Sequence, residues 1–410
     1  MDFRDTAEDA AFRQQVREFL SREFHRDETG ALEGASAAQV AAREGPAGLE
    51  RYQQWMKKLA TRGWIAPAWP VEYGGAGMSI MQQFVFNEEL AKARAPRPGG
   101  IGVGFAGPTI IVYGTEEQKR EHLPGILSGD AVWCQGFSEP EAGSDLASLR
   151  TSAVRDGDDY VVNGQKIWTS GAQLAQRMIL LARTDPQAPK HKGISYFLLD
   201  MKSPGVTVRP LVNMAGTSGF NEVFFDNVRV PAKDLLGEEN RGWYIGTTTL
   251  DFERSSIGSA IAQGNGVEDL VLYVREQAAD GAVVHPTVKL ELAERCVEAE
   301  TARLLSYRVI TMQNKGLVPN HEASAAKLFS SELSQRIAST GMKVVGLYGV
   351  LDRDGHSGQA AASATNRWAP NRGRMMRSYL NAVSGTIAGG TSEVQRGIIA
   401  TRGLGLPKSG

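Results

Sequence analysis

The hydrophobic pattern changes twice along the chain, and this change constrains the fold more than any other feature. Apolar residues such as Phe12, Val16 and Phe19 recur at helical spacing through much of residues 1–130. Residues 131–236 instead hold short apolar runs of strand length, separated by turn residues. Helical spacing returns over 237–410. We predict an α+β protein with an N-terminal α-helical domain, a middle antiparallel β-domain and a C-terminal α-helical bundle.

The length of 410 residues agrees with two or three domains, since one domain usually holds about 100–200 residues. Within the middle region, Asn163-Gly164 predicts a hairpin turn, because both residues tolerate positive φ.

The C-terminal region contains the strongest helical pattern. Apolar residues at three- and four-residue steps predict a long helix over 286–314, which begins at a proline. Two more helices are expected near 321–345 and 391–403. Residues 350–373 lack periodicity and are interpreted as a loop.

Charge and cysteine content limit the possible partners and compartment. Lys plus Arg total 45 and Asp plus Glu total 46, so no basic excess can hold a phosphate backbone, and we expect no nucleic acid partner. The two cysteines, Cys134 and Cys296, favour a reducing compartment over a disulfide framework. The N-terminus lacks the apolar core of a signal peptide. The longest uncharged stretch, 98–115, is too rich in Gly and Pro to predict a membrane span. We therefore expect a cytoplasmic protein.

Local motifs of several enzyme classes are absent. None of the six histidines lies within five residues of another histidine or of a cysteine, so no metal site is predicted. The sequence also contains neither GxSxG nor the phosphate-binding pattern GxxxxGK[ST]. Hydrolase and nucleoside-triphosphatase functions therefore lose their usual support.

Four segments in order resemble the acyl-CoA dehydrogenase family of flavoproteins. They are GPTIIVYGTEEQKREHLPGILSGDAVWCQGFSEPEAGSDLASL at 107–149, VVNGQKIWTSGA at 161–172, LDFERSSIG at 250–258 and TIAGGTSEVQRGIIATRGLGLP at 386–407. The resemblance spans nearly the whole chain. It implies FAD-dependent oxidation of an acyl-CoA thioester to the 2-enoyl-CoA, with loss of the α-proton to a base and of the β-hydride to flavin N5.

The resemblance also implies which residues bind FAD. The expected cofactor-binding residues are Gln135, Phe137, Ser138, Ser144, Trp168, Thr169, Ser170, Lys343, Gly346, Leu347, Thr391, Ser392 and Glu393. Loop amides and hydroxyls suit ring heteroatoms, and an indole can cover one flavin face. Purely structural alternatives exist: a loop that feeds a strand, an aromatic core residue at Trp168, and helix capping by Thr391 or Ser392.

Removal of the α-proton requires a base, such as a carboxylate whose pKa is raised in a desolvated site. Many family members carry a glutamate directly before the GTS turn, but that position here is Gly389, which has no side chain. A second family pattern places the base within LDxER, as in the isovaleryl-CoA dehydrogenase branch, and this predicts Glu253. The alternative is a surface Glu–Arg pair. Gly389 is expected to serve through its backbone N–H, which can bind the thioester oxygen.

The resemblance further implies a set of substrate-binding residues, namely Ser144, Asp251, Phe252, Arg254 and Gly390. The acyl chain itself is not identified, although Phe105 and Met214 are candidates to line a tunnel together with Phe252.

One segment departs from the family. The usual R-x-x-F-G before the long helix is reduced here to Arg275 without the Phe or the spacing. Either Arg275 compensates for the missing part of this segment, or another chain completes the FAD site. We therefore expect a homotetramer or a heterotetramer with a related chain. An electron-transfer flavoprotein is the expected acceptor. Two alternatives remain: an accessory subunit that needs a base-bearing partner, and a flavin-dependent monooxygenase-like relative.

Overall fold

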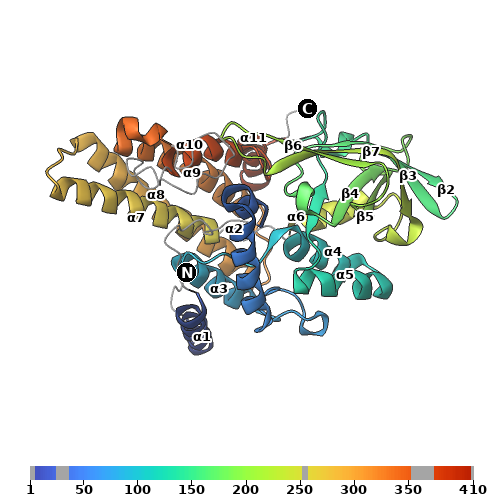
Figure 1. The fold of residues 1–410 in the computed structure, drawn as a ribbon, viewed down its shortest axis with the longest axis horizontal. Helices are drawn as coiled ribbons and strands as arrows, with labels where there is room; N and C mark the ends of the chain where they lie inside the picture. Colours follow the sequence, from blue (N-terminus) through green and yellow to red (C-terminus); the bar gives the residue numbers. More distant parts are fainter. Residues whose placement is uncertain (1–4, 25–36, 252–256, 352–373, 408–410) are drawn as a thin grey trace.

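Helices occupy both ends of the chain and a sheet occupies the middle, which confirms the predicted α+β architecture (Figure 1). The computed structural model describes residues 5–24, 37–251, 257–351 and 374–407. The helices before the sheet are α1 (Ala7–Glu23), α2 (Ala37–Ala60), α3 (Ile80–Lys92), α4 (Gly107–Tyr113) and α5 (Glu116–Ser128). Those after it are α6 (Gly242–Asp251), α7 (Ile257–Ala279), α8 (Pro286–Asn314), α9 (His321–Val345), α10 (Arg374–Ala382) and α11 (Ser392–Ile398).

Helix ends follow local sequence signals. Helix α5 begins with a capping box, in which Thr115 and Gln118 each accept a hydrogen bond from the other residue's backbone N–H. The helices predicted over 286–314 and 321–345 are confirmed as α8 and α9. The helix expected near 391–403 is shorter, because α11 ends at Ile398 and the chain continues as a π-helix.

The middle region forms one seven-stranded sheet. Its strands are β1 (Trp133–Gly136), β2 (Ser152–Asp156), β3 (Asp159–Lys166), β4 (Arg177–Arg183), β5 (Ile194–Asp200), β6 (Val206–Leu211) and β7 (Phe220–Pro231). The order is β1-β4-β2-β3-β7-β6, with β5 on β4. Most pairings are antiparallel as predicted, but β4 runs parallel to β1 and, at one residue pair, to β2.

The hairpin turn predicted at Asn163-Gly164 is wrong. Strands β2 and β3 turn instead at Gly157, whose φ is 63°. Asn163 and Gly164 lie within β3, where the pairing with β7 shifts register. A Cβ at Gly164 would stand 2.6 Å from Thr151 Oγ1, so the glycine permits close packing rather than a turn.

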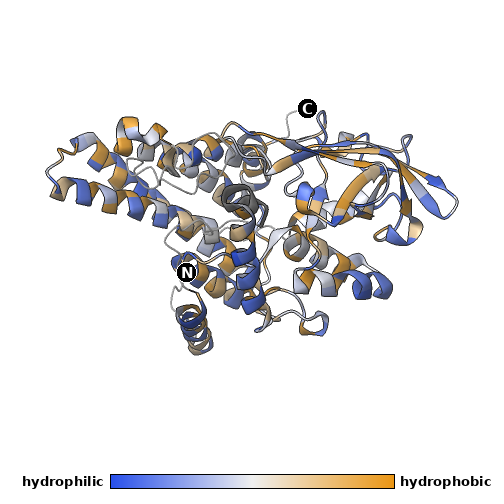
Figure 2. Cartoon of the chain, viewed as in Figure 1, coloured by the Kyte–Doolittle hydropathy of each residue, from blue (hydrophilic) through white to orange (hydrophobic). Residues whose placement is uncertain are grey.

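The three regions share buried cores rather than standing apart. Strands β4 and β5 are hydrophobic along most of their length (Figure 2) and are buried at nearly every position. Ile110 and Leu123 of the N-terminal helices, and Trp69 of the loop after α2, join Ile179 and Tyr196 of these strands in one cluster. Helix α3 packs on α7, and α7, α8 and α9 pack on one another. The N-terminal region therefore packs on the sheet, and α7 and α8 pack on the N-terminal helix α3.

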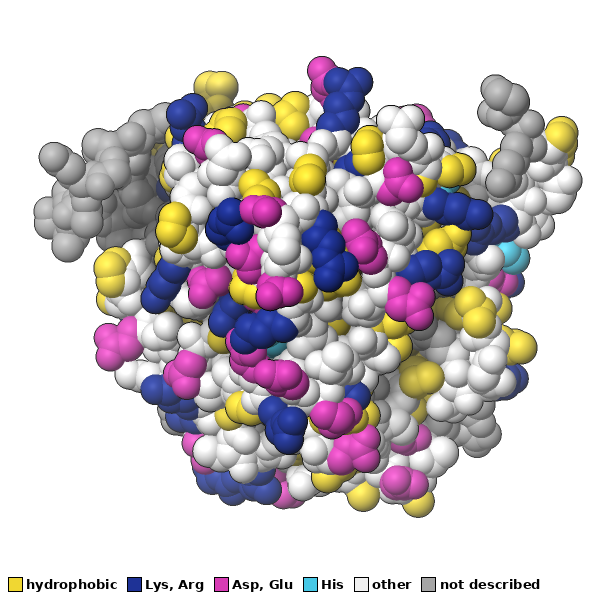
Figure 3. All heavy atoms as spheres, turned by 90° about the vertical axis from the view of Figure 1, so that its right-hand side faces the viewer, with side chains coloured by type: hydrophobic (Ala, Val, Ile, Leu, Met, Phe, Trp, Pro, Cys, Tyr) yellow, Lys and Arg dark blue, Asp and Glu magenta, His cyan; other side chains and the backbone are white. Residues whose placement is uncertain are grey.

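Acidic and basic side chains intermingle on the face that lies at the right of Figure 1 (Figure 3). Arg229 there pairs with Asp156 at 2.6 Å and Asp159 at 3.2 Å. This face therefore presents no field of a single sign. In the part of the chain that the structure describes, no helix combines the length and the apolar composition that crossing a membrane requires.

Candidate active site

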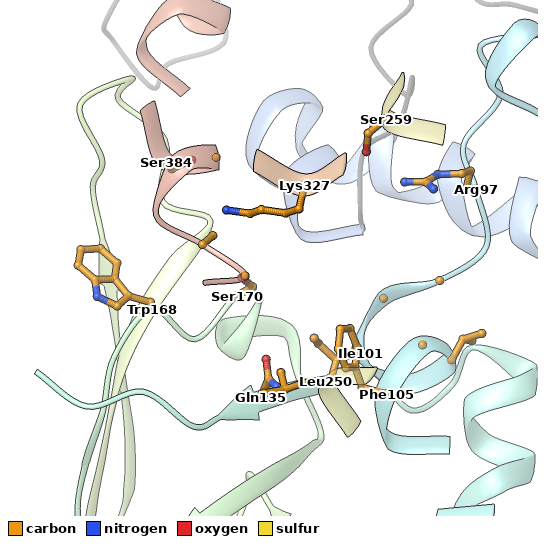
Figure 4. Close-up of a pocket in the computed structure, with 18 of the residues that line it drawn as sticks. Arg97, Ile101, Phe105, Gln135, Trp168, Ser170, Leu250, Ser259, Lys327 and Ser384 are labelled. Atoms are coloured by element: carbon orange, nitrogen blue, oxygen red, sulfur yellow. The ribbon is translucent and has the colours of Figure 1, made fainter. Parts of the chain in front are cut away.

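A large cleft lies where the helices of both chain ends meet the sheet. Its volume is about 3070 Å³, and segments far apart in the sequence line it. Figure 4 shows Gln135 and Trp168 from the sheet region, Lys327 from α9 and Arg97 from the segment before α4 arranged around this space. The end of α6 contributes Leu250. This convergence makes the cleft the candidate active site.

The loop after β1 supplies one wall. Gln135, Phe137, Ser138 and Ser144, all predicted from the sequence, line the cleft. The side-chain Nε2 of Gln135 is buried and has no hydrogen-bond partner among the described residues. A buried amide without a partner is uncommon, and here it marks a donor that a bound group would satisfy.

The WTS segment stands beside this loop. The Ile167 N–H donates to the Ser138 carbonyl at 2.9 Å, so the two predicted segments are directly joined. Trp168 and Ser170 line the cleft, and Trp168 is 61% exposed with a φ of 60°. Positive φ in a bulky residue is strained and is characteristic of functional sites. Thr169 is fully buried, and its Oγ1 makes no hydrogen bond within the part of the chain that the structure describes.

A buried ion pair supports both segments, and sequence reasoning missed it. Lys166 Nζ lies 2.8 Å from Glu139 Oε1 and donates to the Phe137 carbonyl at 3.0 Å. Glu139 also accepts hydrogen bonds from the backbone N–H groups of Arg150 and Thr151. Burial alone would raise the pKa of Glu139, but the Lys166 charge and these hydrogen bonds hold it below its usual value. Burial lowers the pKa of Lys166 to about 8, so the pair is ionised at neutral pH.

The GGTS turn forms another part of the wall. Gly389 and Gly390 have φ values of 65° and 84°, which glycine adopts without strain. Lys327 Nζ donates to the Gly390 carbonyl at 2.6 Å and fixes the turn to α9. The Gly389 N–H makes no hydrogen bond within the described part of the chain. The turn therefore presents a backbone donor at the cleft wall.

The residues after this turn line two different cavities. Thr391 caps α11 by accepting a hydrogen bond from Val394 N–H, and it also lines the cleft. Ser392 and Glu393 line a smaller cavity of about 700 Å³ on the other side. Ser392 is buried, and no described residue forms a hydrogen bond with its Oγ. Capping and cleft lining thus coexist at Thr391.

Other predicted residues lie away from the cleft. Lys343 pairs with Glu291 at 2.7 Å on the outside of α8 and α9. Gly346 ends α9 with a φ of 59°, and Leu347 after it is 90% exposed. None of these three predicted residues is among those that line the cleft.

The predicted base falls in a segment that the structure does not place. Phe252, Glu253 and Arg254 lie outside the described residues, and Asp251 is the last residue of α6. Leu250, one residue earlier, lines the cleft. Phe105 and Met214, the other tunnel candidates, also line it.

The cleft carries more positive than negative groups. Its cationic lining residues are Lys57, Arg94, Arg97, Lys327, Arg377 and Arg402, and the described carboxylates that line it are Asp130 and Asp269. Both Asp269 oxygens accept hydrogen bonds from Arg94 at 2.6 Å. Asp130 accepts one from Ser128 Oγ at 2.7 Å. This excess of positive charge suits a ligand with phosphate groups.

The observed donors fit the expected cofactor. A flavin has ring heteroatoms and a pyrophosphate, and the cleft offers the free amide of Gln135 and cationic side chains. Its wall is continued by the exposed indole of Trp168 and by Ser170. Sequence reasoning did not find Lys327 or Arg97, because neither belongs to a local motif.

Comparisons with known proteins agree with this geometry. Models of the acyl-CoA dehydrogenase N-terminal, middle and C-terminal domains match residues 6–130, 134–228 and 240–404. The chain is 38% identical over 403 residues to acyl-CoA dehydrogenase IpdE1 of Mycobacterium tuberculosis, covering 97% of each protein.

Solved structures show the same likeness. The Tcur3481-Tcur3483 steroid ACAD superposes with a TM-score of 0.84 at 35% identity, covering 100% of both chains. The ChsE4-ChsE5 complex from Mycobacterium tuberculosis gives 0.79 at 35% identity, with the same coverage. Members of the matched family depend on FAD. The chain therefore belongs to the acyl-CoA dehydrogenase family and is an oxidoreductase that acts on the CH–CH bond of acyl-CoA thioesters.

Proposed function

We propose that this protein binds FAD and converts an acyl-CoA thioester to its 2-enoyl-CoA, with Glu253 as the base. The observation that carries this proposal is the cleft, which brings Gln135, Trp168 and the Gly389 turn together with the end of α6. We also retain residues 130/131 and 236/237 as the proposed domain boundaries.

The cofactor would be held mainly by the sheet region. Gln135 and Ser138 would offer hydrogen bonds to the flavin ring, Trp168 would cover one of its faces, and Ser170 would reach its edge. Thr169, which lies between Trp168 and Ser170 in the sequence and is buried, would contribute through its backbone. Bound FAD would supply the acceptor for the hydride that leaves Cβ. The role of the chain is to hold the thioester beside that ring and to move the α-proton.

Elimination within the cleft supports Glu253. The described carboxylates that line the cleft are Asp130 and Asp269, and both are engaged in hydrogen bonds. Gly389 has no side chain at the position that other family members use. Glu253 follows Leu250, which lines the cleft, after only three residues. A base there would enter a partly apolar site, where its pKa rises toward neutrality.

The thioester carbonyl needs a donor as charge develops on its oxygen. The N–H of Gly389 has no other partner in the described structure and is fixed by Lys327 through the neighbouring carbonyl of Gly390. Removal of the α-proton then leaves an enolate-like oxygen that this N–H stabilises. Ser144 from the opposite wall, together with Asp251, Phe252 and Arg254, would position the rest of the thioester.

The substrate class is a bulky acyl group, and we favour a steroid or a fragment of one. The support is a relative described as a steroid ACAD, together with the size of the cleft. An electron-transfer flavoprotein would reoxidise the flavin. We place the reaction in the cytoplasm, where the free cysteines Cys134 and Cys296 would stay reduced.

A second chain would complete the FAD site. Two relatives are named as pairs of chains, Tcur3481-Tcur3483 and ChsE4-ChsE5. Leu347 and its neighbour Tyr348 are 90% and 58% exposed, which suits a subunit contact near the predicted Gly346 segment. We propose a tetramer, with a related chain as the partner that compensates for the altered segment at Arg275. Light scattering of the purified protein, alone and coexpressed with such a chain, tests this assembly; a monomer of 44.3 kDa in both samples contradicts it.

The test of the reaction is anaerobic titration of the purified flavoprotein with a panel of acyl-CoA thioesters. We expect loss of the oxidised flavin absorbance with at least one polycyclic thioester and formation of the matching enoyl-CoA. A protein that takes up FAD, alone and with its partner, but is reduced by no thioester in the panel would overturn the proposed reaction.

A further inference from the structure

Arg97 occupies a distinctive place in the cleft. It lies between α3 and α4 and, in Figure 4, stands across the cavity from Trp168, with Ser259 of α7 beside it. Ile101, Phe105 and Leu250 lie beside Gln135 in that view and, like Arg97, line the cleft. The guanidinium and the proposed flavin site thus share a cleft with an apolar stretch of wall.

The segment that carries Arg97 is firmly held. Trp55 Nε1 donates to the Pro96 carbonyl at 2.8 Å, and both residues are buried. Three residues before Arg97, Arg94 makes two hydrogen bonds of 2.6 Å to Asp269 of α7. These contacts fix the backbone on both the α2 and the α7 sides, so the Arg97 side chain is presented from a positioned loop.

The two arginines of this segment differ in one respect. Arg94 is neutralised by Asp269, whereas Arg97 makes no hydrogen bond or ion pair to any described residue. Burial lowers the pKa of Arg97, and no acidic neighbour offsets this. A guanidinium keeps its proton in proteins and has five donors and no acceptor. A half-buried guanidinium without an acceptor among the described residues can be stabilised by an oxygen of a bound ligand.

We infer that Arg97 binds an acceptor oxygen at the far end of the acyl group, a carboxylate or a ring or chain ketone. The enzyme would therefore prefer an oxygenated acyl-CoA to a pure hydrocarbon one of the same size. This inference rests on the proposed function, because it places the acyl group along the apolar wall of the cleft that Gln135 and Arg97 share. Arg97 is a specificity-determining residue in this account and takes no part in proton removal.

A phosphate of CoA or FAD is the competing ligand for Arg97. The cleft has other cations for that purpose, including Lys57 and Arg402, and the apolar wall formed by Ile101 and Phe105 suits an acyl group. If Arg97 held a phosphate, its removal would weaken the binding of every CoA thioester or of FAD itself. The test separates these outcomes.

The experiment compares matched thioesters on the holoenzyme with its partner chain if one is required. One linear set is octanoyl-CoA, 7-oxooctanoyl-CoA and the CoA monothioester of octanedioic acid. One fused-ring pair differs only in a ring ketone. Binding is measured by anaerobic isothermal titration calorimetry, and kcat/KM with an artificial electron acceptor, for wild type, Arg97→Lys and Arg97→Met. Arg120→Met, which replaces an exposed arginine of α5 outside the cleft, is the matched control.

We expect wild type to bind at least one oxygenated thioester more tightly than its hydrocarbon counterpart. Arg97→Met should lose about ten- to hundredfold in affinity for that thioester, as expected for a charge-assisted hydrogen bond, and change little for the hydrocarbon one. Arg97→Lys should keep part of the preference, and Arg120→Met all of it.

Equal binding of all matched thioesters by wild type would overturn the inference even if Arg97→Met fails to fold. An equal loss for every thioester, or a loss of FAD content, would assign Arg97 to a phosphate instead. If no thioester reduces the flavin, the proposed function fails, while the binding preference still decides the role of Arg97.

Discussion

The pair Glu139–Lys166 gives the sharpest prediction about how the cleft is held together. Lys166 is 0% exposed and has two acceptors, Glu139 Oε1 at 2.8 Å and the Phe137 carbonyl at 3.0 Å. Glu139→Gln keeps the shape of the side chain but leaves a buried ammonium without a counter-charge. Breaking a buried pair in this way typically destabilises a protein by about 3–5 kcal/mol. The end of β1, the start of β2 and the end of β3, which these contacts join, should become less stable together.

The matched control is Asp145→Asn, which removes the exposed pair of Asp145 and Lys190 at 2.9 Å. An exposed pair contributes about 0–1 kcal/mol, so this variant should unfold almost as wild type does. For a chain of this size, 3–5 kcal/mol corresponds to a fall of about 5 °C in the thermal midpoint. The double variant Glu139→Gln with Lys166→Met should recover much of the loss, since no buried charge remains.

Thermal unfolding followed by tryptophan fluorescence, with the ratio of flavin to protein absorbance as a second readout, tests this reasoning. Glu139→Gln should lower both the midpoint and the flavin content. A midpoint for Glu139→Gln equal to that of Asp145→Asn would refute the argument that the buried pair holds the loop after β1 in place.

Two further variants test other parts of the structure. Burial raises the pKa of Asp234 to about 6 from 3.8, so its contribution to stability is full below pH 3.8 and is lost as pH rises through 6. Asp234→Asn should therefore increase the free energy of unfolding at pH 7.5 by at most about 3 kcal/mol and raise the thermal midpoint, and this gain should shrink toward pH 4. An equal gain in the midpoint at both pH values would show that the buried carboxylate is not its cause. A Cβ at Gly390 would meet Gln395 Nε2 at 2.6 Å at a φ of 84°, so Gly390→Ala should destabilise the turn by about 1 kcal/mol or more and lower kcat/KM. Gly397→Ala, where a Cβ meets nothing within 4 Å, is the control, and equal kinetics for the two variants would argue against a role for the turn.

Sequence reasoning succeeded where the signal is local and periodic. Helices α8 and α9 match their predicted bounds because their apolar stripes run for several turns after clear start signals. The Asn163-Gly164 turn failed because the same dipeptide also fits a bulge, and only the packing of Gly164 against Thr151 decides between them.

In the candidate site, too, residues in local motifs were predicted and residues that act through long-range contacts were not. Gln135, Ser138 and Trp168 were predicted through motifs, and the structure brings them to one cleft. The support from Glu139 and Lys166 joins residues 27 positions apart, so no local pattern reveals it. Arg97 was missed because its role depends on having no acidic partner among the described residues, and this can be seen only in the three-dimensional structure.

The central claim, that Glu253 removes the α-proton, is tested most directly by the rate of flavin reduction. Stopped-flow mixing of anaerobic Glu253→Gln holoenzyme with a thioester that reduces wild type should show retained FAD and retained thioester binding, with flavin reduction slowed by about 10²–10⁴-fold. Glu116→Gln, which changes an exposed glutamate of α5 outside the cleft, should reduce at the wild-type rate. Flavin reduction in Glu253→Gln at a rate near wild type would show that the base lies elsewhere.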